Sequence, residues 1–544
     1  MSPLKPVRSL YNYAVDQVLK TIYEILKNRE KDLEPLRKHL INLLHGGIRE
    51  HIIDKAVSDY GSSVCDILDI VELLADSSIQ ELQLLKVYQG HNFQNGELFS
   101  RLNNSNIIGL RKLNLKVHVQ QSNSPRIELL TEGLHKVLRR GLAANLRVLT
   151  LHNGADNQSL SILGKYAEHL THLDITSSWL VDDTGICDLL LKDVSNFINS
   201  NWSDLENCEP HAIKSLSLLP ECTRNKVCRT LCEVKIQDTN TSSISVLLLL
   251  IFARCLKSLG GFLYSRNIGD AILMVQSLDN APEYLELTEL WDTQLPLDKL
   301  TKLAKYLPKL SILYTRAACL PKVPPFLPPL KSLTADFDFV HYGPQLFEFL
   351  EFNGSSITRL VLIDQVYSLD LNLIALYCPL LEELVAKVTV DPSRSSNNPM
   401  SNLKSAIVRI ASGNTFLWIM RQADNIVHLE VLLEREGTEE DAMFENDVIQ
   451  QMIDENPKSL QSIAYLSIHM YFNPRYQICA VSCGTLTINA AYTLCIACDS
   501  LKVLGELHTW FWVSKKDVLS MAEHIKKSNW DVKLRYRDVL YPET

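Results

Sequence analysis

A short pattern of apolar and polar positions, Leu-x-x-Leu-x-Leu, recurs along most of this chain. Copies begin at Leu110, Leu146, Leu170, Leu330, Ile357, Leu381 and Ile426. In a short strand the leucines of each copy point to one side and the x positions to the other. A pattern that recurs in this way predicts an array of stacked units rather than a single closed core.

The spacing of the copies defines the unit. The step from Leu146 to Leu170 is 24 residues, and so is the step from Ile357 to Leu381. This matches the period of about 20–29 residues in leucine-rich repeats. We therefore predict an α/β leucine-rich-repeat solenoid (a horseshoe) with a helical N-terminal module. Further strands are expected near Leu82, Ile213, Leu231, Leu256, Leu285, Leu310, Leu403, Leu460 and Leu501.

Helices are expected between the strands, on the other side of the sheet. The candidates are Leu134–Leu142, Ser159–Ala167, Leu297–Tyr306 and Leu369–Tyr377. The apolar run Ile244–Ala253 is shorter than the roughly 20 residues that a membrane span needs, so it predicts a buried helix. The expected division is a helical module at 1–76, irregular repeats at 77–512 and a cap at 513–544, with a helix at Lys515–Lys526.

The first residues carry a helical pattern instead of the repeat. Leu10, Ala14, Val18 and Ile22 are four residues apart, which places them on one face of a helix. Pro35 suits the first turn of a second helix, where a missing N–H costs nothing.

Two short motifs in these helices resemble known modules. Ser9-Leu10-x-x-x-Ala14-x-x-x-Val18 resembles the elongin-binding box of cullin-RING ubiquitin-ligase substrate receptors, although Ala14 stands where cysteine is usual. Leu33-Glu34-Pro35-Leu36-x-x-x-Leu40 resembles the leucine-proline cullin box, with Glu34 interrupting the pair. With the repeats behind them, the arrangement resembles the zyg-type leucine-rich-repeat receptors. The resemblance implies that Ser9, Leu10, Ala14, Val18, Pro35, Leu36 and Leu40 bind the adaptor side, elongin B/C and a cullin.

Two alternatives remain open. The first helix can be a plain amphipathic helix that caps the array, which would make the chain an interaction scaffold or inhibitor without a ligase role. An F-box-like repeat receptor ranks lower, because the first 50 residues contain neither a Leu-Pro-x-Glu start nor a tryptophan.

Charge and cysteine content narrow the class of partner. The formal net charge is -9, which argues against nucleic acid as the main ligand. The N-terminus has no apolar signal core, and the 13 cysteines form no disulfide framework. A cytoplasmic and/or nuclear protein with reduced thiols, and with no membrane partner, is expected.

We find no sequence motif that indicates catalysis. P-loop, GxSxG, HExxH and kinase signatures are missing from the sequence. The Cys495-x-x-Cys498 pair has apolar flanks and predicts a covering helix rather than a zinc site. We therefore expect that the protein is not an enzyme and that it needs no cofactor or metal.

The outward x positions of the strands form the candidate substrate surface. Their mixed charge suits a protein ligand better than a small molecule. The candidates are His152, His172, Asp174, Asp336, Arg359, Glu383, Lys387, His428 and Glu430. The predicted function is a non-catalytic substrate-recognition subunit of a cullin-RING ubiquitin ligase, with an unknown substrate protein.

Overall fold

The computed structural model places most of the chain in regular elements. It describes residues 10–27, 33–59, 64–84, 95–104, 107–116, 126–192, 203–205, 209–260, 268–292, 297–316, 320, 327–337, 343–363, 369–388, 398–410, 412–433, 444–455, 458–470, 486–510, 512–537 and 539–541. The chain divides into an N-terminal unit, Arg8–Gln294 with Lys305–Lys309, and a C-terminal unit, Leu295–Ala304 with Leu310–Thr544. Each unit is described by itself.

The N-terminal unit contains a parallel sheet in sequence order. Its strands are β1 (Glu81–Leu84), β2 (Lys112–Lys116), β3 (Val148–His152), β4 (His172–Asp174) and β5 (Glu233–Lys235). The repeated leucines lie opposite one another, since Leu82, Leu113, Leu149, Leu173 and Val234 form one row across the sheet. All five are buried, so this row forms the central part of the hydrophobic core of the unit.

The C-terminal unit repeats the same construction. Its strands are β7 (Ile312–Arg316), β8 (Ser332–Asp336), β9 (Arg359–Ile363), β10 (Glu383–Val388), β11 (Ser405–Ile410), β12 (His428–Leu433), β13 (Tyr465–Met470), β14 (Val503–Gly505), β15 (Lys533–Tyr536) and β16 (Val539–Tyr541). Neighbours from β7 to β15 are parallel, and β16 pairs antiparallel with β15.

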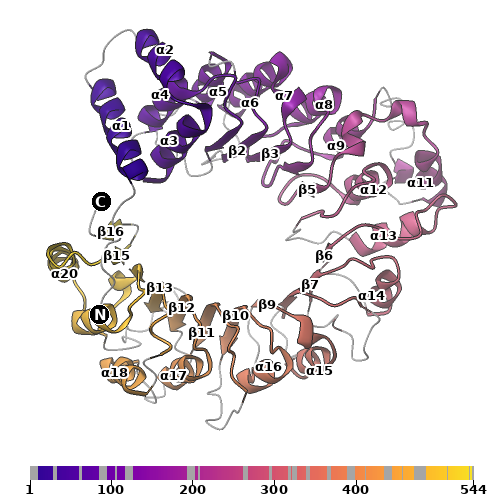
Figure 1. The fold of residues 1–544 in the computed structure, drawn as a ribbon. Helices are drawn as coiled ribbons and strands as arrows, with labels where there is room; N and C mark the ends of the chain where they lie inside the picture. The colour runs from indigo at the N-terminus through magenta and orange to yellow at the C-terminus, as the bar shows by residue number, and fades with distance from the viewer. Residues whose placement is uncertain are drawn as a thin grey trace. The chain divides into compact units, whose positions relative to one another are not determined.

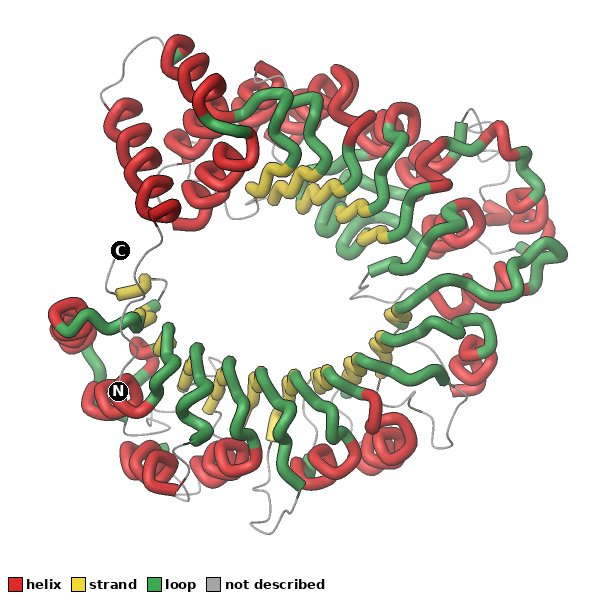
Figure 2. The backbone as a smooth tube through the Cα atoms, in the orientation of Figure 1, coloured by secondary structure: helices red, strands yellow, loops and turns green. Residues whose placement is uncertain are grey.

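Helices cover one side of each sheet (Figures 1 and 2). The N-terminal unit contains α1 (Leu10–Lys27), α2 (Glu34–Leu43), α3 (Gly46–Asp59), α4 (Val64–Leu74), α5 (Asn95–Asn104), α6 (Arg126–Val137), η1 (Leu138–Leu142), α7 (Ala143–Asn145), α8 (Asn157–Tyr166), α9 (Asp183–Leu190), α11 (Pro210–Ser217), η2 (Glu221–Thr223), η3 (Lys226–Arg229), α12 (Ser243–Phe252) and α13 (Ile268–Gln276). The C-terminal unit contains α14 (Leu297–Ala304), α15 (Gly343–Asn353), η5 (Gly354–Ser356), α16 (Leu371–Tyr377), α17 (Gly413–Gln422), α18 (Asn446–Glu455), α19 (Ile488–Ala497), η6 (Leu507–Thr509) and α20 (Lys515–Lys527).

A glycine allows two neighbouring helices to pack closely, and polar side chains cap the N-termini of helices. A Cβ atom on Gly164 of α8 would lie 2.4 Å from the Asp188 carbonyl oxygen, so only glycine allows this approach to α9. Asp156 caps α8 by accepting a hydrogen bond from the Ser159 N–H at 2.8 Å. Ser514 and Asp517 form a reciprocal capping box at the start of α20.

The structure confirms the mixed α/β organisation with parallel strands at the repeated pattern. The four copies with steps of 24 residues correspond to β3, β4, β9 and β10. The apolar run near Ile244 is the buried helix α12, and the expected C-terminal helix is α20. The horseshoe curvature and the division at residues 76 and 512 stay predictions.

One predicted strand is wrong. Ile213 lies in α11, not in a strand. Ala212, Ile213 and Leu216 are all buried, and their spacing fits a helical face; Pro210 stands in the first turn. No helix among the residues that the structure describes combines the length and apolar character needed to cross a bilayer.

Candidate protein-binding surfaces

Helix α1 has two apolar stripes with different surroundings. Val15, Leu19 and Ile22 are buried, with exposed fractions of 3%, 0% and 2%. Leu10 is 84% exposed, Ala14 is exposed and Val18 is half-buried. At 3.6 residues per turn the two stripes are centred roughly a third of a turn apart.

The predicted adaptor stripe is therefore separate from the face that packs. Of the apolar positions expected on one face, Ile22 belongs to the buried stripe, whereas the Leu10 stripe faces away from the core. Ser9 lies outside the described residues. The helix is held in place through its other side, where Asp16 forms an ion pair with Lys55 of α3.

Helix α2 presents the second predicted motif. Pro35 is exposed, and Leu36 and Leu40 are half-buried. Arg37 fixes the helix, because its Nε and Nη2 donate to the carbonyl oxygens of Glu72 and Ala75 at 2.9 Å each. These bonds satisfy carbonyl groups at the end of α4, which have no partner within that helix.

The strand face of the N-terminal unit brings three predicted residues into histidine–carboxylate contacts. Nε2 of His152 lies 3.1 Å from Oδ2 of Asp174, a close contact without the alignment of a good hydrogen bond. His172 lies 3.5 Å from Glu233 on the next strand. Burial raises the pKa of the Asp174 carboxyl, but the interactions with His152 and Thr176 outweigh it, so this pKa lies below its usual value.

The strand face of the C-terminal unit carries the other predicted residues. Nε of Arg359 donates to Oε2 of Glu383 across β9 and β10 at 2.8 Å. Both belong to one row of the sheet, which continues through Ser405 to His428. The remaining candidates, Asp336, Lys387 and Glu430, are half-buried on the same face.

An aromatic cluster on this face was missed by the sequence analysis. The His428 ring stacks on Tyr465 with centroids 4.3 Å apart and an angle of 1°. Arg535 of β15 donates to the Tyr465 hydroxyl at 3.1 Å and also contacts Glu506 at 3.6 Å. The signal was present, because the repeated pattern fits better from Ile463 than from Leu460, which puts Tyr465 in register with His428.

Apolar side chains interrupt the charged rows of the C-terminal unit. Val361, Val385 and Ile407 lie side by side on β9, β10 and β11 and are only half-buried. These aliphatic side chains form an apolar strip between the charged rows of the strand face.

One Ser-His-Asp grouping resembles a catalytic arrangement but serves as a helix cap. Nε2 of His135 lies 2.8 Å from Oδ1 of Asp156 and 3.2 Å from Oγ of Ser159. Ser159 has no exposed surface, and its hydroxyl donates to Asp156 at 2.6 Å. A nucleophile needs access to its substrate and a base that accepts its proton, and this serine has neither.

The two cysteines at α19 behave as core residues. Cys495 and Cys498 are fully buried at α19, and burial raises the pKa of the Cys498 thiol to about 12. Among the residues that the structure describes, no group of three or more His, Cys, Asp or Glu side chains is arranged to hold a metal ion.

Comparison with known proteins gives only distant structural similarity. No protein-family model matches the chain, and no curated protein matches it. Among solved structures, the Rad7 and Elc1 complex in yeast has a TM-score of 0.41 at 12% identity, covering 85% of this chain and 94% of that one. The leucine-rich repeat-containing protein LegL7 from Legionella pneumophila has a TM-score of 0.28 at 11% identity, covering 69% of this chain and 98% of that one. At TM-scores below 0.5 neither similarity carries an argument about this chain's function.

Proposed function

We propose that this protein is a non-catalytic substrate-recognition subunit of a cullin-RING ubiquitin ligase, built as a leucine-rich-repeat solenoid. Helix α1 binds an elongin C-type adaptor, α2 contacts the cullin side, and the strand faces bind the substrate protein. The protein works in the cytoplasm or the nucleus. It raises the local concentration of its target near the ligase and does no chemistry itself.

The exposed leucine of α1 is the observation that carries the proposal. A helix that only caps an array buries its apolar stripe, whereas Leu10 is 84% exposed. The same helix already has a complete packing face in Val15, Leu19 and Ile22. The Leu10 stripe is thus available for a second protein, and its residue types resemble the adaptor-box pattern, with Ala14 in place of the usual cysteine.

The substrate surface is assigned to the strand faces on similar grounds. Ion pairs such as Arg359–Glu383, the half-buried aliphatic side chains of Val361 and Val385, and the stacked rings of His428 and Tyr465 lie on one side of one sheet. Aromatic and arginine side chains dominate binding energy at protein interfaces. We expect the cluster around Tyr465 to contribute more than the isolated charges.

Co-purification with elongin B/C tests the adaptor role. Burial of a leucine side chain contributes about 2–3 kcal/mol, so Leu10→Asp should weaken adaptor binding by at least roughly 30- to 150-fold. Leu376→Asp, which changes a 50% exposed leucine of α16, is the matched control and should bind as the wild type does. Circular dichroism of each variant checks that the fold is kept.

The outcomes separate the competing functions. If the wild-type chain does not bind elongin B/C, the receptor role is wrong and the scaffold interpretation takes its place. If Leu10→Asp binds as well as Leu376→Asp, the adaptor is held elsewhere and the box assignment fails. If the chain binds the adaptor of F-box proteins instead, the F-box-like alternative is correct.

A further inference from the structure

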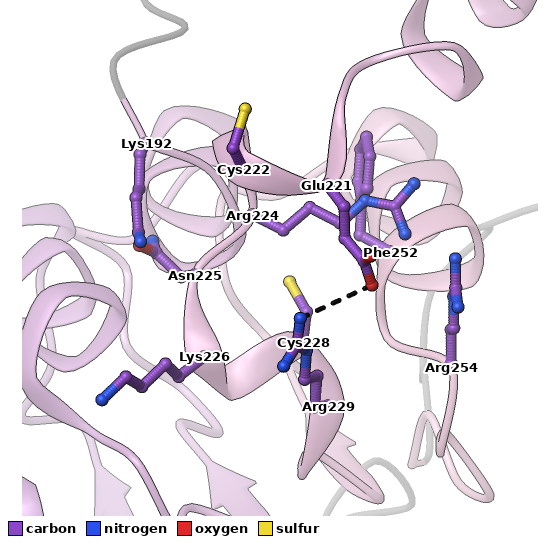
Figure 3. Close-up of a pocket in the computed structure, with 10 residues that line it drawn as sticks. All are labelled: Lys192, Glu221, Cys222, Arg224, Asn225, Lys226, Cys228, Arg229, Phe252 and Arg254. Carbon is purple, nitrogen blue, oxygen red and sulfur yellow. Dashed lines mark ion pairs between the residues drawn. The ribbon is translucent and has the colours of Figure 1, made fainter.

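A basic pocket lies in the N-terminal unit, lined by residues at the ends of α9 and α12 and by η2 and η3 (Figure 3). It has a volume of about 340 Å³. Cationic side chains surround it, and Glu221 is the carboxylate in its lining. The cations are Lys192, Arg224, Lys226, Arg229 and Arg254. The lining of this pocket is therefore positively charged, although the formal net charge of the whole chain is -9.

The wall of the pocket is fixed by hydrogen bonds to the end of α9. The buried Asn225 side chain donates to the carbonyl oxygens of Asp188 and Leu189 at 3.0 Å each, and to Leu191 at 3.2 Å. The Lys192 N–H donates to the Thr223 carbonyl oxygen at 2.7 Å. These bonds hold η2 and η3 against α9, so the backbone positions of Lys192, Arg224, Lys226 and Arg229 are fixed relative to one another.

Two of the cations already have carboxylate partners. Lys226 forms an ion pair with Glu168, and its side chain extends away from Arg229 and Arg254 in Figure 3. Arg229 lies 3.6 Å from Glu221. The partner of Arg229 is thus itself part of the pocket lining.

The other three cations have no carboxylate partner among the described residues. Lys192 and Arg254 are exposed. Arg224 lies over the Phe252 ring, 5.2 Å from its centroid, and its buried Nε has no hydrogen-bond partner in the described part of the chain. A buried guanidinium donor without an acceptor is costly, and guanidinium groups bind anions strongly.

We propose that this pocket binds a phosphate group carried by a phosphorylated side chain of another protein. Arginine guanidinium groups match phosphate oxygens in charge and in geometry, and several around one cavity are typical of phospho-motif recognition. A nucleic acid would need a basic surface that extends beyond a single cavity, which the acidic net charge of the chain disfavours. This proposal does not depend on the adaptor role of α1.

The test is a pull-down of the full chain with a degenerate phosphoserine and phosphothreonine peptide library, followed by affinity measurement on the enriched peptides. Their unphosphorylated counterparts, inorganic phosphate, phosphoserine and single-stranded RNA form the comparison arms. We expect the phosphopeptides to bind at least tenfold more tightly than each comparison. Binding should weaken with added salt, since it is electrostatic.

Variants connect the binding to the pocket. Arg254→Gln and Arg224→Gln should each weaken phosphopeptide binding by about tenfold or more. Glu221→Gln should strengthen it a few-fold, because it removes a carboxylate that competes for Arg229. Arg140→Gln, at an exposed residue of η1, is the matched control. Since Arg224 packs on Phe252, Arg254→Gln keeps the test valid if Arg224→Gln unfolds.

Several results would overturn the proposal. Equal binding of phosphorylated and unphosphorylated peptides would remove the phosphate requirement. Free phosphate or RNA that binds as tightly as the peptides, and is lost in Arg254→Gln, would show a different ligand. Weakening in Arg140→Gln that equals the weakening in Arg254→Gln would show a diffuse charge effect instead of a site.

Discussion

Asp183 provides a stability test that follows directly from the way neighbouring repeats are joined. It is the first residue of α9 and is buried, with 7% of its surface exposed. Its Oδ1 accepts hydrogen bonds from the main-chain N–H of Ser242 at 2.7 Å and of Ser245 at 3.1 Å, and from the Ser245 hydroxyl. One carboxylate thus caps the N-terminus of α12, a helix some 60 residues later in the chain.

Removal of this carboxylate leaves buried donors without an acceptor. A hydrogen bond to a charged group contributes about 1.5–3 kcal/mol, and a buried orphan donor costs about 1–3 kcal/mol. We therefore expect Asp183→Ala to lower the free energy of unfolding by about 3 kcal/mol or more. Asp183→Asn should lose less, because the amide oxygen still accepts.

The neighbouring Asp182 is the matched control. It is exposed, caps its own helix through the Thr184 N–H at 2.8 Å and accepts a second hydrogen bond from the Asn157 side chain at 2.8 Å. Because water can replace these exposed bonds, Asp182→Ala should cost only about 1 kcal/mol. Urea unfolding followed by circular dichroism measures both effects, and hydrogen exchange of α12 peptides locates them. Equal losses of unfolding free energy in the two variants would refute the proposed role of Asp183 in joining α9 to α12. Unchanged hydrogen exchange of α12 in Asp183→Ala would refute it as well.

Two further predictions concern titration. Burial raises the pKa of Asp156, but hydrogen bonds from His135 and Ser159 outweigh it and leave this pKa below 3.8. The ionised Asp156 carboxylate therefore stabilises the fold fully above pH 3.8, and this contribution disappears as the pH falls through the lower pKa of the folded state. The unfolding free energies of wild type and Asp156→Asn should accordingly differ near pH 6 and converge in strong acid. A constant difference across this range contradicts the charge argument. A second prediction concerns thiol reactivity, because iodoacetamide reacts with accessible thiolates. At pH 8 it should label the exposed thiols Cys222 and Cys255 of the native protein well before the buried Cys498, as peptide mass spectrometry would show. Early labelling of Cys498 would mean that its helix opens readily.

The strands were predictable because burial acts on every repeat in the same way. Inward leucines such as Leu149 and Leu360 have no exposed surface, so the pattern that marks them survives wherever a strand stacks on its neighbours. Register was predictable for the same reason, since a shift by one residue would turn the leucines to solvent. Ile213 was misassigned because Ile213, Leu216 and Leu218 match the repeated pattern, although Ala212, Ile213 and Leu216 form the buried face of helix α11.

The binding surfaces were less predictable because they depend on groups far apart in sequence. The basic pocket combines Lys192 with Arg254, and the aromatic cluster combines His428 with Arg535. No local pattern connects such positions. The exposure of Leu10 was likewise hidden, since its spacing with Ile22 suits a packing face and only the tertiary structure shows which stripe is covered.

The ends of the two ladders bear on self-assembly. Glu50 of α3 accepts the main-chain N–H of Gln80 and of Glu81 at 2.5 and 3.2 Å, so a side chain occupies donors at the edge strand β1. At the other ladder, β16 reverses direction and ends the parallel series after three residues. A stack of identical strands is a template on which further chains can polymerise. Each device protects one end of its ladder, so loss of the Glu50 carboxylate should favour end-to-end polymerisation of concentrated protein through β1.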